Sequence, residues 1–211
     1  MNRSDFRGFV RAGIALGAVL ASTALATTAA AAVPGGDAGQ GRASAARQGV
    51  ERGCAVVYFD LGETLVHSAE DGSIGYRPGA AAYLRELRER RIPVGLITNV
   101  PSAWGETDAE RAAALKKEID SAWTGSEPFA WGDFGDRILT PRTEEERKPA
   151  PVLWERAKAG AGGCRLVYQA ETAEEVDVAA SLGYVAYLIG QPSRPDYLPA
   201  RLIELLAHLP R

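Results

Sequence analysis

The sequence predicts an α/β domain built on a doubly wound parallel sheet, and two patterns indicate it. From residue 54 onward, short apolar runs alternate with longer amphipathic segments of helical period. The apolar runs lack polar alternation, as strands buried on both faces do. Strands that alternate with helices form a parallel sheet covered on both faces, because parallel strands need crossover connections. The chain has 211 residues and 46% hydrophobic content, which suffices for one well-buried domain.

Five apolar runs are expected to be the strands, each short and rich in β-branched or aromatic residues. The expected strands are residues 54–59, 94–98, 137–140, 164–169 and 184–189. The expected helices are residues 80–91, 107–123, 151–159, 172–182 and 198–209. Pro151 suits the first turn of a helix, whereas Gly160 and Gly183 suit positions at a helix end.

Residues 1–32 are predicted to be a signal peptide and not part of the fold. Three arginines precede an alanine-rich apolar run at 12–29, and the alanines at 30–32 offer a cleavage site. An uncleaved anchor is the alternative, because about 20 apolar residues can span a bilayer. The low leucine content of the run favours cleavage, after which no stable membrane span is expected.

The mature protein is therefore expected to be secreted, periplasmic or held in the cell envelope. Residues 33–52 are rich in Gly, Ala and Arg and are expected to be a flexible linker, followed by the α/β domain at 53–211. Two cysteines, Cys54 and Cys164, suggest one disulfide in an oxidising compartment and not a metal cluster. The net charge of −3, without a basic run, gives no electrostatic reason to bind nucleic acid. A small molecule or another protein is the expected partner.

Polar segments follow four of the expected strands, at the edge of the sheet where ligands of such folds bind. These segments are residues 60–66 (DLGETLV), 98–99 (TN), 147–151 (RKPAP) and 170–175 (AETAEE). An acidic residue such as Asp60 at the end of a buried strand is costly unless it has a partner or a task. Carboxylate, hydroxyl, lysine and acidic cluster thus occur in that order.

These motifs, spread over residues 54–190, resemble the four motifs of the haloacid dehalogenase (HAD) superfamily. The resemblance implies that Asp60 is a catalytic nucleophile that forms an aspartyl-phosphate. It implies that Thr98 hydrogen-bonds the phosphoryl oxygens and that Lys148 neutralises charge on the nucleophile and the phosphate. The implied substrate-binding residues are Asn99 and Thr64.

The resemblance also implies a Mg²⁺ ion, a cation that prefers oxygen ligands. The implied ligands are Asp60, the backbone carbonyl of Gly62, Glu171 and Glu175. It further implies a Rossmann-like sheet of order 5-4-1-2-3 with a minimal cap. In that order the strands that start at Cys54 and Cys164 are parallel neighbours, so the two cysteines are expected to form a disulfide.

The first motif has a closer local likeness and one departure. Residues 60–68 (DLGETLVHS), with 76–79 (YRPG), resemble the DLDETLVHS…RPG run of the small CTD phosphatases. Gly62, however, stands where phosphatases of the superfamily carry an Asp that acts as general acid/base. The fourth motif departs too, since Glu171 and Glu175 stand where aspartates are usual, and a one-residue shift of the alignment would instead put Ala170 at the metal-ligand position. Both departures predict slow chemistry.

The leading expectation is a Mg²⁺-dependent phosphomonoesterase with an open site, acting on a phosphorylated small molecule or a phosphoprotein. A catalytically impaired binding or structural domain of the same fold is the alternative. Attack by Asp60 on carbon, as in the dehalogenases, is a third reading without a distinctive motif.

Two groups of residues also have structural readings. Glu175 lies three residues after Thr172, so the two could form a capping box at a helix start, and Glu171 could be a helix-terminal acid. An aromatic group between the second and third motifs could stack on a substrate ring or form the core of an insertion. Its members are Trp123, Phe129, Trp131 and Phe134.

Overall fold

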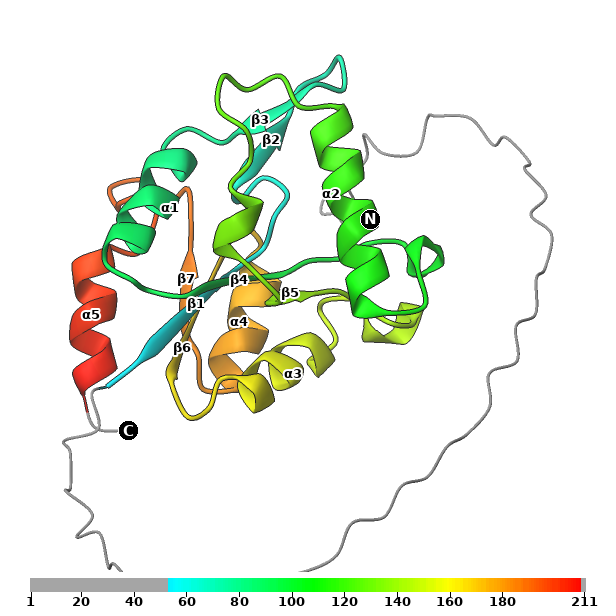
Figure 1. Ribbon diagram of the computed structural model, residues 1–211. Coiled ribbons are helices and arrows are strands. Elements are labelled where there is room, and N and C mark those ends of the chain that lie inside the picture. Colours follow the sequence, from blue (N-terminus) through cyan, green and yellow to red (C-terminus); the bar gives the residue numbers. More distant parts are fainter. Residues whose placement is uncertain (1–52, 210–211) are drawn as a thin grey trace, which may run out of the picture. The chain divides into compact units, whose positions relative to one another are not determined.

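The computed structural model describes residues 53–209, which form an α/β domain around one parallel sheet (Figure 1). The predicted signal peptide (1–32) and linker (33–52) lie outside the described residues. Within the described part of the chain, no helix is long and apolar enough to cross a membrane.

The central sheet has five strands, and each neighbouring pair runs parallel. The strands are β1 (Ala55–Phe59), β4 (Val94–Ile97), β5 (Ile138–Leu139), β6 (Arg165–Ala170) and β7 (Val185–Leu188). Their order across the sheet is β5-β4-β1-β6-β7. Numbered along the chain as core strands and taken from the β7 edge, this is the 5-4-1-2-3 order, so the predicted doubly wound α/β fold is confirmed.

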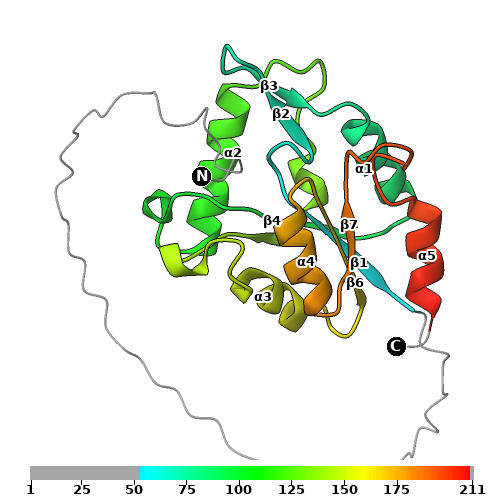
Figure 2. The same ribbon diagram turned by 180° about the vertical axis from the view of Figure 1, so that it is seen from behind.

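Helices cover both faces of this sheet (Figures 1 and 2). They are α1 (Ala80–Glu89), α2 (Asp108–Ser121), α3 (Val152–Gly160), α4 (Ala173–Ser181) and α5 (Ala200–His208). Strand β1 explains the two layers, because successive side chains of a strand point to opposite faces. Val57 and Phe59 pack in the cluster that includes α1, α2 and α5, whereas Val56 and Tyr58 pack with α3 and α4.

A short hairpin, which the sequence analysis did not anticipate, lies between β1 and α1. It consists of β2 (Val66–Ser68) and β3 (Ile74–Tyr76), paired antiparallel. A bridge from Ile74 to Trp123 joins the hairpin to the end of α2. With only this hairpin before α1, the structure has no large cap at that point among the described residues.

The aromatic group forms the core of the insertion between β4 and β5, which was one of its two readings. Phe129 lies at its centre, stacked on Tyr76 at 5.3 Å and on Phe134 at 5.7 Å between ring centroids. Both indole N–H groups donate to acceptors of the same insertion, from Trp123 to the Glu127 carbonyl and from Trp131 to Asp120, each at 2.8 Å. Because the polar edges of these rings are satisfied within the insertion, they act as packing residues.

Three short 3₁₀ helices complete the connections: η1 (Ser102–Trp104), η2 (Trp131–Asp133) and η3 (Glu144–Glu146). Helix α2 begins with a capping box, in which Thr107 and Glu110 bond each other's backbone N–H. This box fixes the start of α2 one residue after the predicted boundary.

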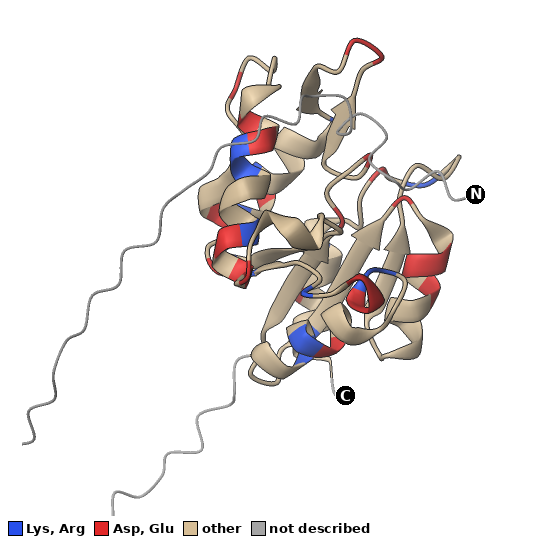
Figure 3. Ribbon diagram, turned by 90° about the vertical axis from the view of Figure 1, so that its right-hand side faces the viewer, with Lys and Arg blue, Asp and Glu red and all other residues tan. Residues whose placement is uncertain are grey.

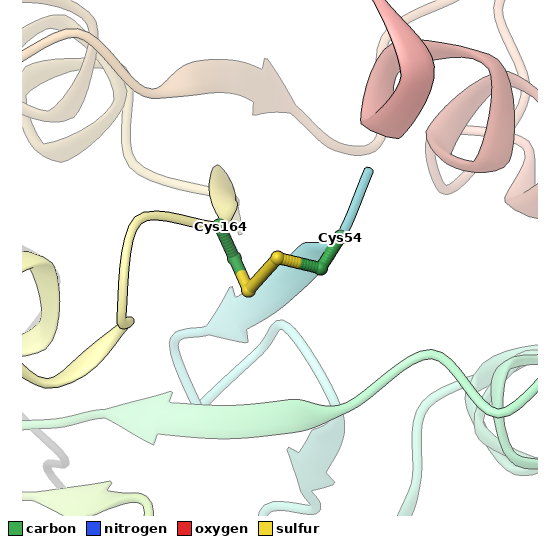
Figure 4. Close-up of a disulfide and its surroundings, with 2 residues drawn as sticks. All are labelled: Cys54 and Cys164. Carbon is green, nitrogen blue, oxygen red and sulfur yellow. A yellow bond between two sulfur atoms is a disulfide. The ribbon is translucent and has the colours of Figure 1, made fainter. Parts of the chain in front are cut away.

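The predicted disulfide between Cys54 and Cys164 is present, with a Cα–Cα distance of 4.8 Å (Figure 4). The two cysteines precede β1 and β6, whose register pairs Ala55 with Arg165. The Arg165 N–H donates to the Cys54 carbonyl at 2.8 Å, so the hydrogen-bond ladder between β1 and β6 begins beside the disulfide. The cross-link therefore fastens the amino ends of the two central strands.

Removing this cross-link is expected to destabilise the domain strongly. The cysteines are separated by 110 residues, and closing so long a loop restricts the unfolded chain by about 4–5 kcal/mol in the chain-entropy model. We expect Cys54→Ala/Cys164→Ala to lower the free energy of unfolding by about that amount in denaturant titrations. Dithiothreitol should have the same effect on the wild type and none on the double variant. A loss below about 1 kcal/mol would contradict this account.

Candidate functional site

The candidate site lies at the carboxyl ends of the central strands, where Figure 3 shows acidic segments in the loops beyond the arrowheads. Asp60 follows β1 directly, and its N–H donates to the Gln169 carbonyl of β6 at 3.1 Å. Thr98 follows β4, and its N–H donates to the Leu139 carbonyl of β5 at 3.1 Å. Sheet pairing thus continues one step past both strands, which fixes these two buried residues at the rim.

Lys148 is the centre of the site, although it comes from the loop before α3. Its ammonium Nζ lies 2.5 Å from Asp60 Oδ1 and 2.7 Å from Glu175 Oε2, and its side chain is 2% exposed. The Asn99 side chain makes two hydrogen bonds to the backbone of Lys148. The Lys148 N–H donates to Asn99 Oδ1 at 2.9 Å, and Asn99 Nδ2 donates to the Lys148 carbonyl at 3.2 Å. Asn99 therefore positions the lysine in this structure.

A second contact chain joins Asp60 to Glu171 through Thr64. The Thr64 hydroxyl lies 2.9 Å from Glu171 Oε2 and 3.5 Å from Asp60 Oδ2, so its single proton is better placed for Glu171. The Glu171 N–H donates back to Thr64 Oγ1 at 3.3 Å, and Thr172 Oγ1 donates to Glu171 Oε1 at 2.9 Å. Asp60 thus has the lysine at one oxygen and the Thr64–Glu171 pair near the other.

The capping reading of Glu175 is not what the structure shows. Thr172 is the N-cap of α4, but its side chain makes no capping hydrogen bond. Glu175, in the first turn of α4, turns its carboxylate to Lys148 and to the Tyr168 hydroxyl, both at 2.7 Å from Oε2. A carboxylate in a first helical turn remains electrostatically favourable without a capping bond.

Three carboxylates and one ammonium leave the site with excess negative charge. Burial, opposed by Lys148 and reinforced by Glu175 and Glu171, raises the pKa of Asp60 to about 7. Burial lowers the pKa of Lys148, but Asp60 and Glu175 outweigh it, so the net pKa is raised and the ammonium stays charged. Burial also raises the pKa of Tyr168, which therefore remains a hydrogen-bond donor. A site with this charge surplus has an electrostatic reason to take up a proton or a cation.

The oxygen-rich donor set fits Mg²⁺, but only part of it is free to bind. No group of three or more His, Cys, Asp or Glu side chains within residues 53–209 is arranged to hold a metal ion. Asp60 Oδ2 and the Glu171 carboxylate lie beside neutral hydroxyl groups, whereas Glu175 Oε2 already accepts two hydrogen bonds, one of them from the Lys148 ammonium. Mg²⁺ usually takes one or two protein carboxylates and keeps several waters. Asp60 and Glu171 suit that pattern.

The turn after Asp60 carries a conformational feature that the sequence did not signal. Glu63 has a left-handed φ of 52°, an uncommon conformation for a residue with a side chain. Its half-exposed carboxylate accepts from the Ser68 N–H at 3.1 Å and contacts His67 Nδ1 at 2.7 Å. Glu63 is therefore tied to the β2–β3 hairpin. Gly62 is not among the described glycines with positive φ.

Sequence reasoning missed Tyr168 as a member of the site. It lies within the apolar run that forms β6, is fully buried, and bonds Glu175 while its oxygen lies 3.4 Å from Lys148 Nζ. The available signal was the residue type, because a buried tyrosine needs a partner for its hydroxyl and the acidic fourth motif follows directly. The structure brings Asp60, Lys148 and Glu175 together, with Thr64 and Glu171 beside them.

Comparisons with known proteins find likeness only at the level of structure. No family model and no curated protein matches the sequence. An uncharacterized protein from Listeria monocytogenes serotype 4b matches with a TM-score of 0.43 at 15% identity, over 69% of this chain and 85% of that one. A "putative HAD-like phosphatase" from Mesorhizobium loti matches with a TM-score of 0.46 at 15% identity, over 74% of this chain and 85% of that one. The strand order of the present chain is the one that its resemblance to the HAD superfamily predicts.

Proposed function

We propose that this protein is an exported, Mg²⁺-dependent phosphomonoester hydrolase that acts through an aspartyl-phosphate at Asp60. One observation carries the proposal: a buried carboxylate at a strand end touches a buried lysine through one oxygen and approaches a threonine–glutamate pair through the other. Phosphoryl transfer needs this combination of nucleophile and positive charge. The disulfide is consistent with export to an oxidising compartment.

In the proposed reaction, a carboxylate oxygen of Asp60 attacks phosphorus while the ester P–O bond breaks. The departing alkoxide takes a proton from water, and a second water then attacks phosphorus and frees Asp60. Lys148 offsets the charge that gathers on the phosphoryl oxygens, and the Thr98 hydroxyl hydrogen-bonds one of them. Bound Mg²⁺ would supply additional positive charge at Asp60, Glu171 and the Gly62 carbonyl.

Two structural features indicate which substrates the site would take. The hairpin before α1 is short, and the insertion between β4 and β5 holds one α-helix and two 3₁₀ helices, too little for a large cap. A site with so little cover is open to bulky groups, so phosphoproteins and phosphorylated small molecules both belong to the proposal. The missing carboxylate at Gly62 leaves proton transfer to water, which predicts slow turnover.

The test is phosphate release from an aryl phosphate, phosphoserine and a phosphotyrosine peptide, each with Mg²⁺ or with EDTA. We expect slow release that requires Mg²⁺ and disappears in Asp60→Asn. Acid quenching during turnover should trap a phosphoprotein in the wild type alone. Release that continues unchanged in EDTA would contradict the metal requirement, and equal release by Asp60→Asn would contradict the nucleophile.

A binding domain is the second candidate, favoured by Gly62 and by the absence of a preformed three-ligand metal cluster in residues 53–209. Such a domain would use the Lys148 ammonium to hold a phosphorylated partner without cleaving it. Saturable binding of inorganic phosphate with no ester hydrolysis at any Mg²⁺ concentration would establish this candidate and exclude the first.

A further inference from the structure

We propose that Glu175 and Tyr168 form a bracket that positions the Lys148 ammonium group, so that Glu175 serves the lysine and not the metal ion. The inference rests on the proposed function, since it assigns two residues of the same site. The bracket consists of two groups, the Glu175 carboxylate and the Tyr168 hydroxyl, and the Lys148 ammonium is the group that it positions. Asp60 is the remaining contact of the ammonium and the residue on which the lysine acts.

The hydrogen bonds around Lys148 account for its orientation. A lysine ammonium has three N–H donors. Two of them are directed to Asp60 at 2.5 Å and to Glu175 at 2.7 Å, and the Tyr168 oxygen is a weaker third neighbour at 3.4 Å. The two carboxylates therefore hold the ammonium between them. The third N–H is the one least committed to the protein and can turn to a phosphoryl oxygen.

Glu175 is itself immobilised by Tyr168. One carboxylate oxygen, Oε2, accepts from the ammonium and from the Tyr168 hydroxyl, each at 2.7 Å. Glu175 is 6% exposed and Tyr168 is fully buried, and the Tyr168 ring packs edge-on against Trp154 at 5.4 Å between centroids. Strand β6 and helix α3 thus fix the tyrosine, the tyrosine fixes the glutamate, and the glutamate fixes the lysine.

The two glutamates of the fourth motif consequently have different surroundings. The Glu171 side chain contacts the hydroxyls of Thr64 and Thr172 and is only partly buried. The Glu175 oxygen, in contrast, is occupied by a cation of the protein itself. A Mg²⁺ ion at that oxygen would have to replace two short hydrogen bonds, whereas at Glu171 it would replace contacts with neutral hydroxyls. We therefore assign Glu171 to the metal ion and Glu175 to Lys148.

The test compares Tyr168→Phe and Glu175→Gln with a matched control, Tyr184→Phe. Tyr184 is also a buried tyrosine of the same core cluster, and its hydroxyl donates to the Trp154 carbonyl at 2.5 Å, away from Lys148. The first readout is acetylation of Lys148 in the full-length protein, quantified by mass spectrometry against exposed Lys158. We expect acetylation of Lys148 to become at least about fivefold faster in both variants, because Glu175→Gln removes a charged partner of the ammonium and Tyr168→Phe removes the hydroxyl that holds Glu175 against it. Acetylation should stay unchanged in Tyr184→Phe.

Direct titration of Mg²⁺ by calorimetry is the second readout and needs no turnover. We expect Glu175→Gln and Tyr168→Phe to keep the wild-type affinity within about twofold, and Glu171→Gln to lose at least about tenfold, as removal of a carboxylate ligand should. Loss of affinity in Glu175→Gln as large as in Glu171→Gln would overturn the inference. An equal rate of Lys148 acetylation in Tyr168→Phe and Tyr184→Phe would also overturn it.

Kinetics give a third readout where the protein hydrolyses esters. Tyr168→Phe should lower kcat by about 5- to 50-fold with little change in KM, because the lysine acts on charge that develops in the transition state. A wild type without hydrolysis would overturn the proposed function alone, since the acetylation and Mg²⁺ readouts would still decide whether the bracket exists.

Discussion

Asp60→Asn is expected to lose at least about 10³-fold in phosphate release and, in the same protein, to gain stability without metal. The loss follows because asparagine has no carboxylate to attack phosphorus, and removal of a nucleophile is among the costliest changes an enzyme can undergo. The gain follows because Asp60 is a buried carboxylate whose pKa is raised from 3.8 to about 7, with burial as the main cause. Its charged form is therefore disfavoured in the folded, metal-free protein.

The pH dependence of this gain has a definite sign. An acid whose pKa is higher in the folded than in the unfolded state makes folding take up a proton. Stability is then lost as pH rises from about 4 through about 7, and Asp60→Asn removes that loss. With 1.36 kcal/mol for each pKa unit, discounted because Lys148 partly neutralises the charge, we expect a gain of about 1–3 kcal/mol at pH 8 and almost none at pH 4. Lys148 keeps Glu175 as a partner in the variant.

Denaturant unfolding in EDTA at both pH values measures the effect. Asp71→Asn is a suitable control, since Asp71 is an exposed carboxylate that accepts from the Ser73 N–H, and its pKa is lowered by that bond. No stability gain is expected there at pH 8. If Asp60→Asn instead lowered the free energy of unfolding at pH 8, the contact between Asp60 and Lys148 would stabilise the fold by more than burial of the carboxylate destabilises it. The excess negative charge of the site would then not reduce stability.

The sheet could be predicted from the sequence because its signals are local and strong. Runs buried on both faces, such as Val56 to Phe59, contain no polar residue and allow few other assignments. The polar residues at the strand ends were found for the same reason, since Asp60 interrupts an apolar pattern. The disulfide followed once the strand order placed Cys54 and Cys164 on neighbouring strands, and the structure confirms it.

The partners of the site residues could not be predicted, because they depend on side-chain directions across the fold. Thr172 and Glu175 have the spacing of a capping box, yet burial beside Lys148 gives Glu175 a stronger, charged partner than a backbone N–H. Tyr168 lies in a run whose period shows only that it is buried. The β2–β3 hairpin was missed because each strand has three residues, too few for a pattern of alternation.

Gly62→Asp is the change expected to accelerate the proposed hydrolysis. A carboxylate two residues beyond Asp60 could protonate the leaving oxygen and later activate the attacking water, and a positioned acid or base commonly contributes about 10²–10⁴-fold. The backbone permits the substitution, because Gly62 is not among the residues with positive φ, and the strained position of the turn is Glu63. Glu63 is bonded to Ser68 and His67, so it does not already fill the missing role in this structure.

The added carboxylate would also raise the negative charge around Asp60, so the gain is expected only with Mg²⁺ near saturation. We expect turnover, or decay of an acid-trapped phosphoprotein, to rise by about 10²-fold, the lower end of the range for a positioned acid or base. Gly62→Asn is the matched control, since asparagine has nearly the same shape but cannot exchange a proton at neutral pH, and it should give no increase. If Gly62→Asn and Gly62→Asp increased turnover equally, the shape of the new side chain and not proton transfer would explain the gain. A folded, Mg²⁺-binding Gly62→Asp protein that still hydrolyses no ester would show that Asp60 is no nucleophile here, and would leave phosphate binding as the task of the site.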